Sequence, residues 1–580
     1  MRLYARCAAP ILLVTSAFVF GTELFLAARD RDPRSQGAQI PQQPAPAGAP
    51  PAGAQPPGQT PPAGGRGGGR GNPAAALFTA TCSGCHGTPE VTGRAPWLFD
   101  QKWLDGTDDE KIATTVRRGI PEKGMVGFTP EQLSDQQIFQ LINYIRTATA
   151  NLKPKPAYVA DPDGKIITSE KQTFKLEVLT REVNTPFGLA FLPDGRLLIT
   201  ERNGTLRMLD KKNQLSAPIT GTPKPHVQQD GGFLDVTVHP QYAKNGWIYL
   251  SYSEVQPGYV APPPSPPADP SAAPATPPAA APPAANAGAP GGGFGGGPGR
   301  GRGGPPQPPS NTVIVRGKIN KHNEWTDQQV IFRSPTELYV SSGVHFGSRF
   351  AWDREGHLFF TLGERGTMQN AQELKNGLGK IHRVNDDGSV PKDNPFVNSP
   401  GADATIWSYG HRNPEGLAWE PGTGRLWESE HGPTGGDEIN IIEKGHNYGW
   451  GVASKGLQGG ITKTAEAGMD DPIVYYTPAI APAGITFYTG SRYPGWKNTS
   501  LLVGGLVGQQ LRRLEISSEK VVKQEVLFSE FGRVRDVVQG PDGYLYMALQ
   551  TPTGGQGVPL SAATPGMIVR LVPETSTQPR

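Results

Sequence analysis

One phrase recurs along most of the 580-residue chain: an apolar strand, a polar turn and a second apolar strand. The segment FGLAFLPDGRLLITER shows the form, with a Pro-Asp-Gly turn between two apolar runs. Six copies lie at 187–202, 234–253, 349–365, 416–432, 485–505 and 534–550. Such a unit buries its faces only against its neighbours, which favours a closed ring. The sequence therefore predicts a mainly β domain over residues 170–575, a six-bladed β-propeller, although a β-sandwich with β extensions also fits the pattern.

Glycine and proline are concentrated in two stretches. The chain has 75 Gly and 60 Pro, and both are enriched in a linker at 29–71 and an insert at 256–311. Neither stretch has enough apolar side chains to offset the entropy of ordering, so both are predicted to be disordered. Strand-like sequences flank the insert, which makes it a surface loop between two strands.

Charge and cysteine content exclude several classes of protein. The net charge of +3 provides no broad basic field, so no nucleic-acid partner is expected. Three cysteines are too few for a multi-disulfide scaffold or a four-cysteine zinc site.

Residues 1–28 have the form of an export segment. Arg2 and Arg6 precede an apolar run at 7–20, and further apolar residues follow Glu23. This pattern fits either a cleaved signal peptide or an uncleaved N-terminal membrane anchor. Both alternatives place the remaining chain in the periplasm.

Residues 72–150 are predicted to form a small all-α domain that carries haem. Asn72 and Pro73 provide a helix cap and a first-turn proline. Cys82, Cys85 and His86 then form the C-x-x-C-H pattern of covalent haem attachment. Half a zinc site or a redox dithiol are the alternatives. Zinc would need two further soft ligands, and 72–150 contains no other Cys or His.

Elimination leaves one residue as the sixth iron ligand. Met125 is the one methionine between His86 and residue 151, and its loop is rich in glycine. A lone methionine can also be core filler or a surface residue, but thioether ligation would raise the reduction potential. A capping box at 134–137 precedes an apolar helix face at 138, 141, 142 and 145. The whole of 72–150 resembles a class I cytochrome c.

Polar, glycine-rich stretches between the blades hold the candidate catalytic residues. Loops that join propeller blades gather at one end of the ring. His345, Arg412, Asn413, Arg533 and Arg535 are therefore expected to converge there. A group of arginines favours a polyanionic ligand, and a histidine beside them is a candidate general base. Taken singly, each of these residue types is more often structural than catalytic.

The motifs HFGSR, GHRNPEG, EHGPTGGDEIN, NYGW and RVRD together resemble the soluble aldose (glucose/sorbosone) dehydrogenases that use pyrroloquinoline quinone (PQQ). The resemblance spans roughly 175–575 and implies a six-bladed propeller with PQQ and Ca²⁺ at the channel mouth. It implies His345 as the base, Arg412 and Asn413 on the quinone side, and Arg533 and Arg535 on the cofactor carboxylates. It further implies backbone carbonyls of Gly432 and Pro433 on the Ca²⁺ that bridges PQQ, and Glu438 and Tyr448 at a second, structural Ca²⁺.

Four positions depart from the pattern of that family. Val507 stands where the family has a cofactor-binding lysine. Asp230 and Glu415 each replace a usual glutamine, and Val344 replaces an aspartate found before the base in glucose oxidisers. The missing lysine bears on PQQ binding, and the changed neighbours bear on the sugar that is accepted.

These observations predict a quinohaemoprotein oxidoreductase. It would oxidise an aldose or similar sugar or alcohol with PQQ and Ca²⁺, and pass electrons singly to haem c. An external quinone or another cytochrome would then accept them, reached through the tether at 34–71. The alternative is a non-catalytic propeller that binds partners and carries a cytochrome shuttle. A calcium propeller lactonase is a third possibility, although such sites use carboxylates rather than arginines.

Overall fold

The computed structural model describes residues 72–152, 156–261, 307–456, 460–552 and 564–574. The described residues all belong to one compact unit. The predicted signal or anchor at 1–28, the linker at 29–71 and most of the insert lie outside the described residues. Among the helices in the described ranges, none is long and apolar enough to cross a membrane.

The N-terminal described domain consists of helices. These are α1 (Pro73–Thr81), α2 (Ser83–His86), α3 (Gln101–Asp105), α4 (Asp109–Arg118), the 3-10 turn η1 (Pro121–Lys123) and α5 (Asp135–Leu152). Helix α1 begins as predicted, since the Asn72 side chain accepts a hydrogen bond from the Ala74 N–H and Pro73 follows.

Helix α5 also begins and packs as its sequence predicts. Ser134 and Gln137 exchange hydrogen bonds between side chain and backbone, which is the expected capping box. One face of α5 is buried, and it packs with Phe78 and Phe99 into the core of the domain. This face consists of Ile138, Leu141, Ile142 and Ile145.

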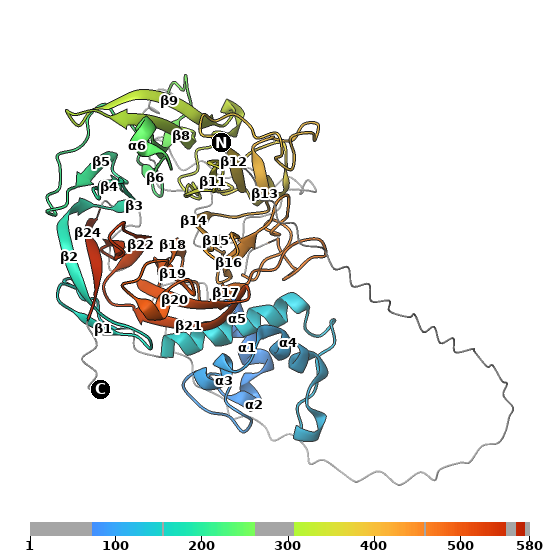
Figure 1. Cartoon of the computed structure of the whole chain (residues 1–580). Coiled ribbons are helices and arrows are strands. Elements are labelled where there is room, and N and C mark those ends of the chain that lie inside the picture. The colour runs from blue at the N-terminus through green and yellow to red at the C-terminus, as the bar shows by residue number, and fades with distance from the viewer. Residues whose placement is uncertain (1–71, 153–155, 262–306, 457–459, 553–563, 575–580) are drawn as a thin grey trace, which may run out of the picture. The chain divides into compact units, whose positions relative to one another are not determined.

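Six antiparallel sheets follow and form the blades of a propeller (Figure 1). Blade 1 contains β3 (Pro186–Phe191), β4 (Leu197–Glu201) and β5 (Thr205–Leu209). Blade 2 contains β6 (Phe233–Val238), β7 (Ile248–Val255), β8 (Ser310–Ile319) and β9 (Trp325–Arg333). Blade 3 contains β10 (Phe350–Trp352), β11 (Leu358–Leu362), β12 (Lys380–Val384) and β13 (Ile406–Tyr409).

The remaining three blades complete the ring. Blade 4 contains β14 (Pro414–Trp419), β15 (Leu426–Glu430), β16 (Asp437–Ile442) and β17 (Val474–Tyr476). Blade 5 contains β18 (Pro482–Phe487), β19 (Ser500–Gly505), β20 (Gln510–Ser517) and β21 (Lys520–Phe528). Blade 6 contains β22 (Arg533–Gln539), β23 (Leu545–Gln550), β24 (Pro565–Pro573), β2 (Thr173–Asn184) and β1 (Ile166–Thr168).

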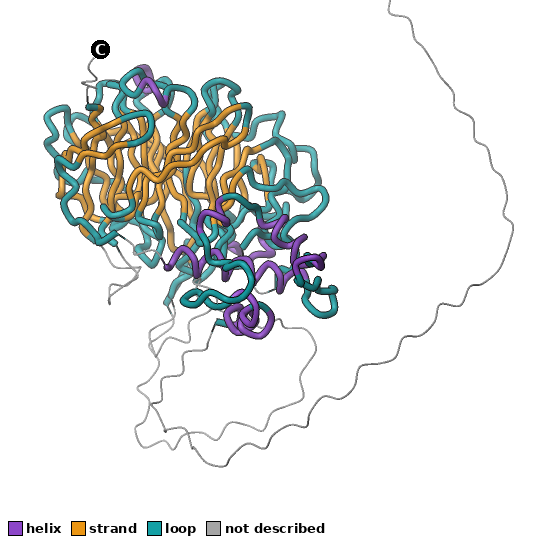
Figure 2. Tube along the Cα trace, turned by 90° about the horizontal axis from the view of Figure 1, so that it is seen from below, coloured by secondary structure: helices purple, strands orange, loops and turns teal. Residues whose placement is uncertain are grey.

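Each of the six sequence phrases forms the first two strands of one blade. The phrases become β3–β4, β6–β7, β10–β11, β14–β15, β18–β19 and β22–β23. Figure 2 shows these strands side by side, with the loops at their ends. The six-bladed propeller and the preceding helical domain are therefore confirmed.

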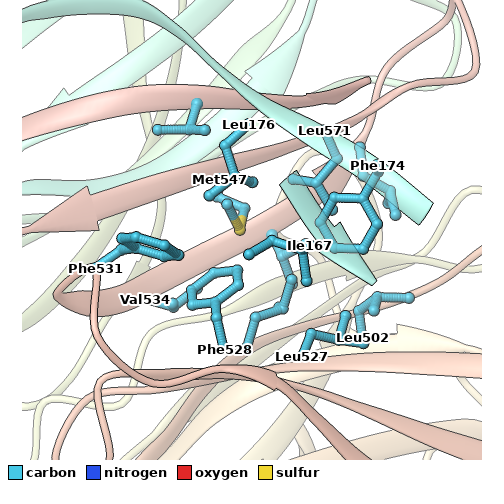
Figure 3. Close-up of a cluster of buried hydrophobic side chains, with 14 of the residues drawn as sticks. Ile167, Phe174, Leu176, Leu502, Leu527, Phe528, Phe531, Val534, Met547 and Leu571 are labelled. Atoms are coloured by element: carbon cyan, nitrogen blue, oxygen red, sulfur yellow. The ribbon is translucent and has the colours of Figure 1, made fainter. Parts of the chain in front are cut away.

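Blade 6 closes the ring with strands from distant parts of the sequence. Strand β2 pairs with β24, from Phe174 opposite Pro573 to Asn184 opposite Pro565. A large apolar cluster lies between this blade and blade 5 (Figure 3). It includes Phe174, Leu502, Phe528, Val534 and Met547, all buried. Burial of this cluster and the strand pairing together hold the ring closed.

The insert in blade 2 is shorter than predicted. Val255 at the end of β7 pairs with Ser310 at the start of β8, so the strand begins inside the predicted range of 256–311. Ser310 and Asn311 were expected in the loop but are buried strand residues. The other short elements are α6 (Tyr242–Asn245), η2 (Thr336–Leu338), η3 (Met368–Gln372) and η4 (Pro494–Trp496).

Candidate functional site

His345 forms a buried pair with Glu364, at the end of β11. Nδ1 of His345 lies 2.7 Å from Oε1 of Glu364, and the carboxylate also accepts the Gly366 N–H. Burial and the charge of Arg412 lower the pKa of His345, which outweighs the opposite effect of Glu364. The imidazole is therefore neutral at pH 7. Because Nδ1 carries the proton donated to Glu364, Nε2 is the basic nitrogen.

The backbone around His345 adopts an uncommon conformation. His345, Gly347 and Ser348 have φ of +56°, +62° and +80°, a region that L side chains rarely occupy. The amide of Asn413 holds this loop, because its Oδ1 accepts the Gly347 N–H at 3.0 Å. Strained backbone held by its surroundings is typical of functional sites.

Arg412 lies between the His345 loop and blade 4. Its Nη1 donates to the His431 carbonyl at 3.1 Å, and its backbone N–H donates to Glu430 at 2.6 Å. The guanidinium carbon lies 5.2 Å from the centre of the Trp450 ring. Its buried Nε has no hydrogen-bond partner among the described residues. Arg412 can therefore donate to a ligand.

Glu415 connects Asn413 to Arg535. Its Oε1 accepts from Asn413 at 2.9 Å, and its Oε2 accepts from Arg535 at 2.6 Å. Burial disfavours the ionised form of Glu415, but His431, Arg535 and Asn413 together lower its pKa. The charge of Arg535 is therefore balanced within the chain.

Arg533 is different, since no described carboxylate lies within ion-pair distance of it and its buried Nε has no partner. Burial and the neighbouring charge of Arg535 lower the pKa of Arg533 to about 10. A β-bulge falls between Val534 and Asp536, so the simple alternation that would place Arg533 and Arg535 on one strand face does not hold. The charge of Arg535 nevertheless acts on Arg533 and contributes to its lowered pKa.

A buried arginine ties four blades together beneath this site. Arg349 contacts Asp235 of blade 2 at 3.2 Å and Asp536 of blade 6 at 3.1 Å. It also donates to the backbone carbonyl of Glu415 in blade 4. Arg349 and its partners therefore form a charged network that links these blades at the centre of the ring.

A second buried cluster lies in blade 4, next to Arg412. The ligand atoms of His411, Glu428 and Glu430 all lie within 4.8 Å of one another. The register of β15 and β16 places Glu430 opposite Glu438 and Glu428 opposite Asn440. Burial and the charge of Glu430 raise the pKa of both Glu428 and Glu438 well above the usual value.

Two oxygens of this cluster are buried without partners. Oε1 of Glu428 and Oδ1 of Asn440 have no hydrogen-bond donor among the described residues. A hard cation such as Ca²⁺ would stabilise this arrangement, in which carboxylates repel one another and oxygens lack hydrogen-bond donors.

The residues predicted to hold calcium lie mostly around one cavity. Gly432, Glu438 and Tyr448 line it together with Arg412 and Glu430. The lining of that cavity does not include Pro433. The Tyr448 hydroxyl donates to the Ile441 carbonyl and accepts the Glu443 N–H, so it already has two partners within the chain.

The C-x-x-C-H segment has the arrangement expected for a haem ligand. Nδ1 of His86 donates to the Pro96 carbonyl at 2.7 Å, which leaves Nε2 for a metal. Cys82 and Cys85 are not joined by a disulfide. Met125 closes a small loop by pairing with Ile120. Among the described residues, Cys82, Cys85 and His86 do not form a three-ligand cluster around a single ion.

The sequence model of the family described as Glucose / Sorbosone dehydrogenase matches residues 183–556. The chain belongs to the glucose/sorbosone dehydrogenase family. A second model, described as Cytochrome C oxidase, cbb3-type, subunit III, matches residues 69–145.

Individual relatives of this chain agree with the family match. The Aldose sugar dehydrogenase YliI of Escherichia coli (strain K12) is 35% identical over 391 residues, covering 66% of this chain and 91% of that protein. Quinoprotein glucose dehydrogenase B of Acinetobacter calcoaceticus is 25% identical over 471 residues, covering 67% and 87%. The crystal structure of the soluble Aldose sugar dehydrogenase from Escherichia coli in the apo-form has a TM-score of 0.55 at 32% identity, covering 69% and 100%.

The positions that depart from the family pattern lie in different surroundings. Val507 is 58% exposed in the turn between β19 and β20. A lysine at this position, as in the family, would therefore be exposed to solvent. Asp230 lies near the arginines and raises the pKa of Arg412 and Arg533, in part offsetting their burial. The backbone carbonyl of Val344 accepts a hydrogen bond from Arg365.

Several residues of the candidate site were not predicted from the sequence. Glu364, Arg349 and the cluster of His411, Glu428 and Glu430 belong to this group. Glu428 and Glu430 alternate on a fully buried strand, which is a signal that two carboxylates share one face. Glu364 follows a buried apolar strand directly, but its pairing with His345 depends on the path of the intervening loop.

Proposed function

We propose that this sugar dehydrogenase-like chain is a quinohaemoprotein. It oxidises an aldose or a similar sugar or alcohol with PQQ and Ca²⁺, and passes the electrons one at a time to a covalently bound haem c. The observation that carries the proposal is the buried, neutral His345, hydrogen-bonded to Glu364 and next to Arg412. Removal of a hydroxyl proton requires a base, a carboxylate that orients the base, and a cation.

The arginines fit a polyanionic cofactor. Arg412 and Arg533 each have a buried Nε without a partner among the described residues. Arg535 is already paired with Glu415, so Arg533 would hold a cofactor carboxylate more freely than Arg535. PQQ, when bound, supplies the quinone carbonyl that accepts hydride from the sugar.

The side chains of this chain then have defined roles. Nε2 of His345 takes the proton of the sugar hydroxyl. Glu364 stabilises the resulting imidazolium through the bond to Nδ1. Arg412 stabilises negative charge that develops beside it. Asn413 positions the His345 loop through Gly347 rather than through a contact with substrate.

The carboxylate cluster and the cavity beside it fit Ca²⁺. Glu428, Glu438 and Asn440 offer oxygen ligands, and Gly432 offers a backbone carbonyl on the wall that Arg412 shares. One cation here would relieve the repulsion that raises the pKa of the carboxyls.

The helical domain supports the haem part of the proposal. His86 presents Nε2, and Met125 is the proposed second axial ligand. Cytochrome c-L of Methylorubrum extorquens is 32% identical over 98 residues, covering 17% of this chain and 49% of that protein. We place the protein in the periplasm, where an external quinone or cytochrome would reoxidise the haem.

The test is the visible spectrum of the full-length, haem-loaded protein with PQQ and Ca²⁺, before and after addition of a panel of aldoses and alcohols. We expect sugar to reduce the haem only when both PQQ and Ca²⁺ are present. His345→Ala should abolish reduction and retain PQQ binding, whereas His322→Ala, an exposed histidine, should behave as wild type. Failure of PQQ to bind would instead favour the non-catalytic binding module.

A further inference from the structure

The outer face of α5 contacts the propeller through buried polar groups. Nδ2 of Asn143 donates to the Thr434 carbonyl at 3.1 Å, and Asn143 is only 6% exposed. Nε2 of Gln136 donates to the Ile461 carbonyl at 3.2 Å. A Cβ atom added at Gly435 would lie 2.8 Å from Nδ2 of Asn143, so the helix and the loop approach each other closely.

A second contact joins the same domain to β17. The Tyr475 hydroxyl donates to Oδ2 of Asp109 at 2.7 Å, and Oδ1 of Asp109 receives Nε of Arg146 at 2.5 Å. Asp109 is 8% exposed, and Arg146 also donates to the carbonyls of Leu104 and Thr107. One buried carboxylate thus links α4 and α5 to blade 4. A buried carboxylate that lost the Tyr475 donor would be partly unsatisfied, which disfavours separation.

The loop that Asn143 touches is part of the candidate site. Thr434 stands two residues after Gly432, which lines the cavity shared with Arg412. The preceding residue, His431, accepts the hydrogen bond from Arg412 through its carbonyl. A short path of bonded and contacting groups therefore runs from Arg412 through the 431–434 backbone to α5.

The order of the segments also favours a fixed domain. The Pro/Gly-rich stretch at 34–71 precedes the cytochrome, so it does not separate the cytochrome from the propeller. Residues 153–165 alone connect α5 to β1. The stretch at 34–71 therefore does not give the haem free movement relative to the propeller.

We propose that α5 is a fixed electron-transfer contact on the 432–436 loop, held in place by the Tyr475–Asp109–Arg146 bridge. The inference rests on the proposed function. Oxidation of one sugar alcohol group to a carbonyl releases two electrons and two protons. The hydroxyl proton leaves by way of His345, and the proton that is transferred as part of the hydride is released when the two electrons leave singly through the docked cytochrome to an external one-electron acceptor.

The test compares two double variants of the full-length, haem-loaded protein with PQQ and Ca²⁺. Asn143→Ala with Tyr475→Phe removes both contacts. Asn151→Ala with Tyr546→Phe is the matched control, since Asn151 is exposed on α5 and Tyr546 donates to Asp542 away from this contact. Stopped-flow absorbance follows haem reduction by sugar, a small redox dye reports on the propeller site, and hydrogen exchange reports on 434–436.

We expect the interface variant to reduce its haem at least tenfold more slowly, with unchanged dye reduction and faster exchange at 434–436. The control should match wild type in all three measurements. Unchanged haem reduction, or an equal fall in dye and haem reduction, would overturn the docked contact. If wild type reduces neither dye nor haem, the proposed function fails instead. Should the double variant not fold, Tyr475→Phe alone repeats the test.

Discussion

Nδ1 of His345 and Oε1 of Glu364 are 2.7 Å apart, in a loop whose backbone is left-handed at the histidine itself. The carboxylate fixes the tautomer and the orientation of the ring. It also raises the pKa of His345, against the larger lowering by burial and by Arg412. His345 and Glu364 therefore act together, because the charge of Glu364 changes the pKa of His345.

Replacement of this carboxylate should affect both rate and pH dependence. In wild type the base is active when neutral, so kcat/KM should fall only as the pH drops below about 6.5, the usual pKa of histidine. Glu364→Gln should lower kcat by about a hundredfold. Because the charge that raises the pKa of His345 is lost, the acid limb should move to lower pH.

Steady-state kinetics between pH 4.5 and 8 with a small dye acceptor, a range chosen to span that value by about two units, measures both effects. Glu355→Gln, at an exposed turn, is the control and should change neither. An acid limb that moves to higher pH in Glu364→Gln would contradict the proposed electrostatic role.

Calcium should stabilise the folded protein through the carboxylate cluster of blade 4. At a hundred times its dissociation constant, a bound cation adds about 2.7 kcal/mol to the free energy of unfolding. Chelation should therefore lower the melting temperature of wild type. Glu438→Gln should remove most of the calcium dependence of the melting temperature. Thermal melts with and without added Ca²⁺ measure this difference.

The group of Asp353, Glu355 and His357, of which Glu355 is exposed, offers a matched control for that measurement, because it also brings three possible ligands together. Glu355→Gln should leave the calcium-dependent shift intact. Equal shifts in Glu438→Gln and wild type would place the cation elsewhere.

Loss of the central arginine should destabilise the ring. Arg349→Met leaves Asp235 and Asp536 buried without their shared cation, which should cost about 3–5 kcal/mol. Burial already raises the pKa of Asp235 to about 7, so the variant should be least stable at alkaline pH, where both carboxyls must ionise. Urea unfolding followed by tryptophan fluorescence measures the change. Arg354→Met, at an exposed turn, should alter stability by less than about 0.5 kcal/mol.

The haem ligands make a separate prediction. Met125→Ala should retain covalent haem and lower its reduction potential, because a thioether favours the reduced iron. His86→Ala should lose the normal spectrum altogether. Spectroelectrochemical titration measures both, with Met469→Ala in the propeller as the control. A potential that is unchanged in Met125→Ala would show that another group completes the coordination.

Local pattern predicted the fold well because each blade begins with a hairpin of adjacent strands. The capping box at Ser134 and the apolar face of α5 were likewise visible, since both depend on neighbours within one or two turns. Closure by β2 and β24 carried no local signal, because its paired residues, such as Phe174 and Pro573, are separated by most of the chain.

The same distinction explains which site residues were found. Arg412 and Asn413 stand together in one motif and could be singled out. The role of Glu364 depends on its pairing with His345, which forms only when the loop after His345 folds back on β11. The role of Arg349 likewise appears only when four blades meet. Glu415 was noticed as a departure, but its pairing with Arg535 required the closed ring.

Ring closure by β2 and β24 also fixes the order in which the protein can be assembled. Helix α5 precedes the loop that it touches by 291 residues, and the blade that holds that loop needs its neighbours to be stable. A chain that emerges N-terminus first thus completes its cytochrome while the docking surface does not yet exist. Docking of the cytochrome therefore follows completion of the blade that holds the 432–436 loop.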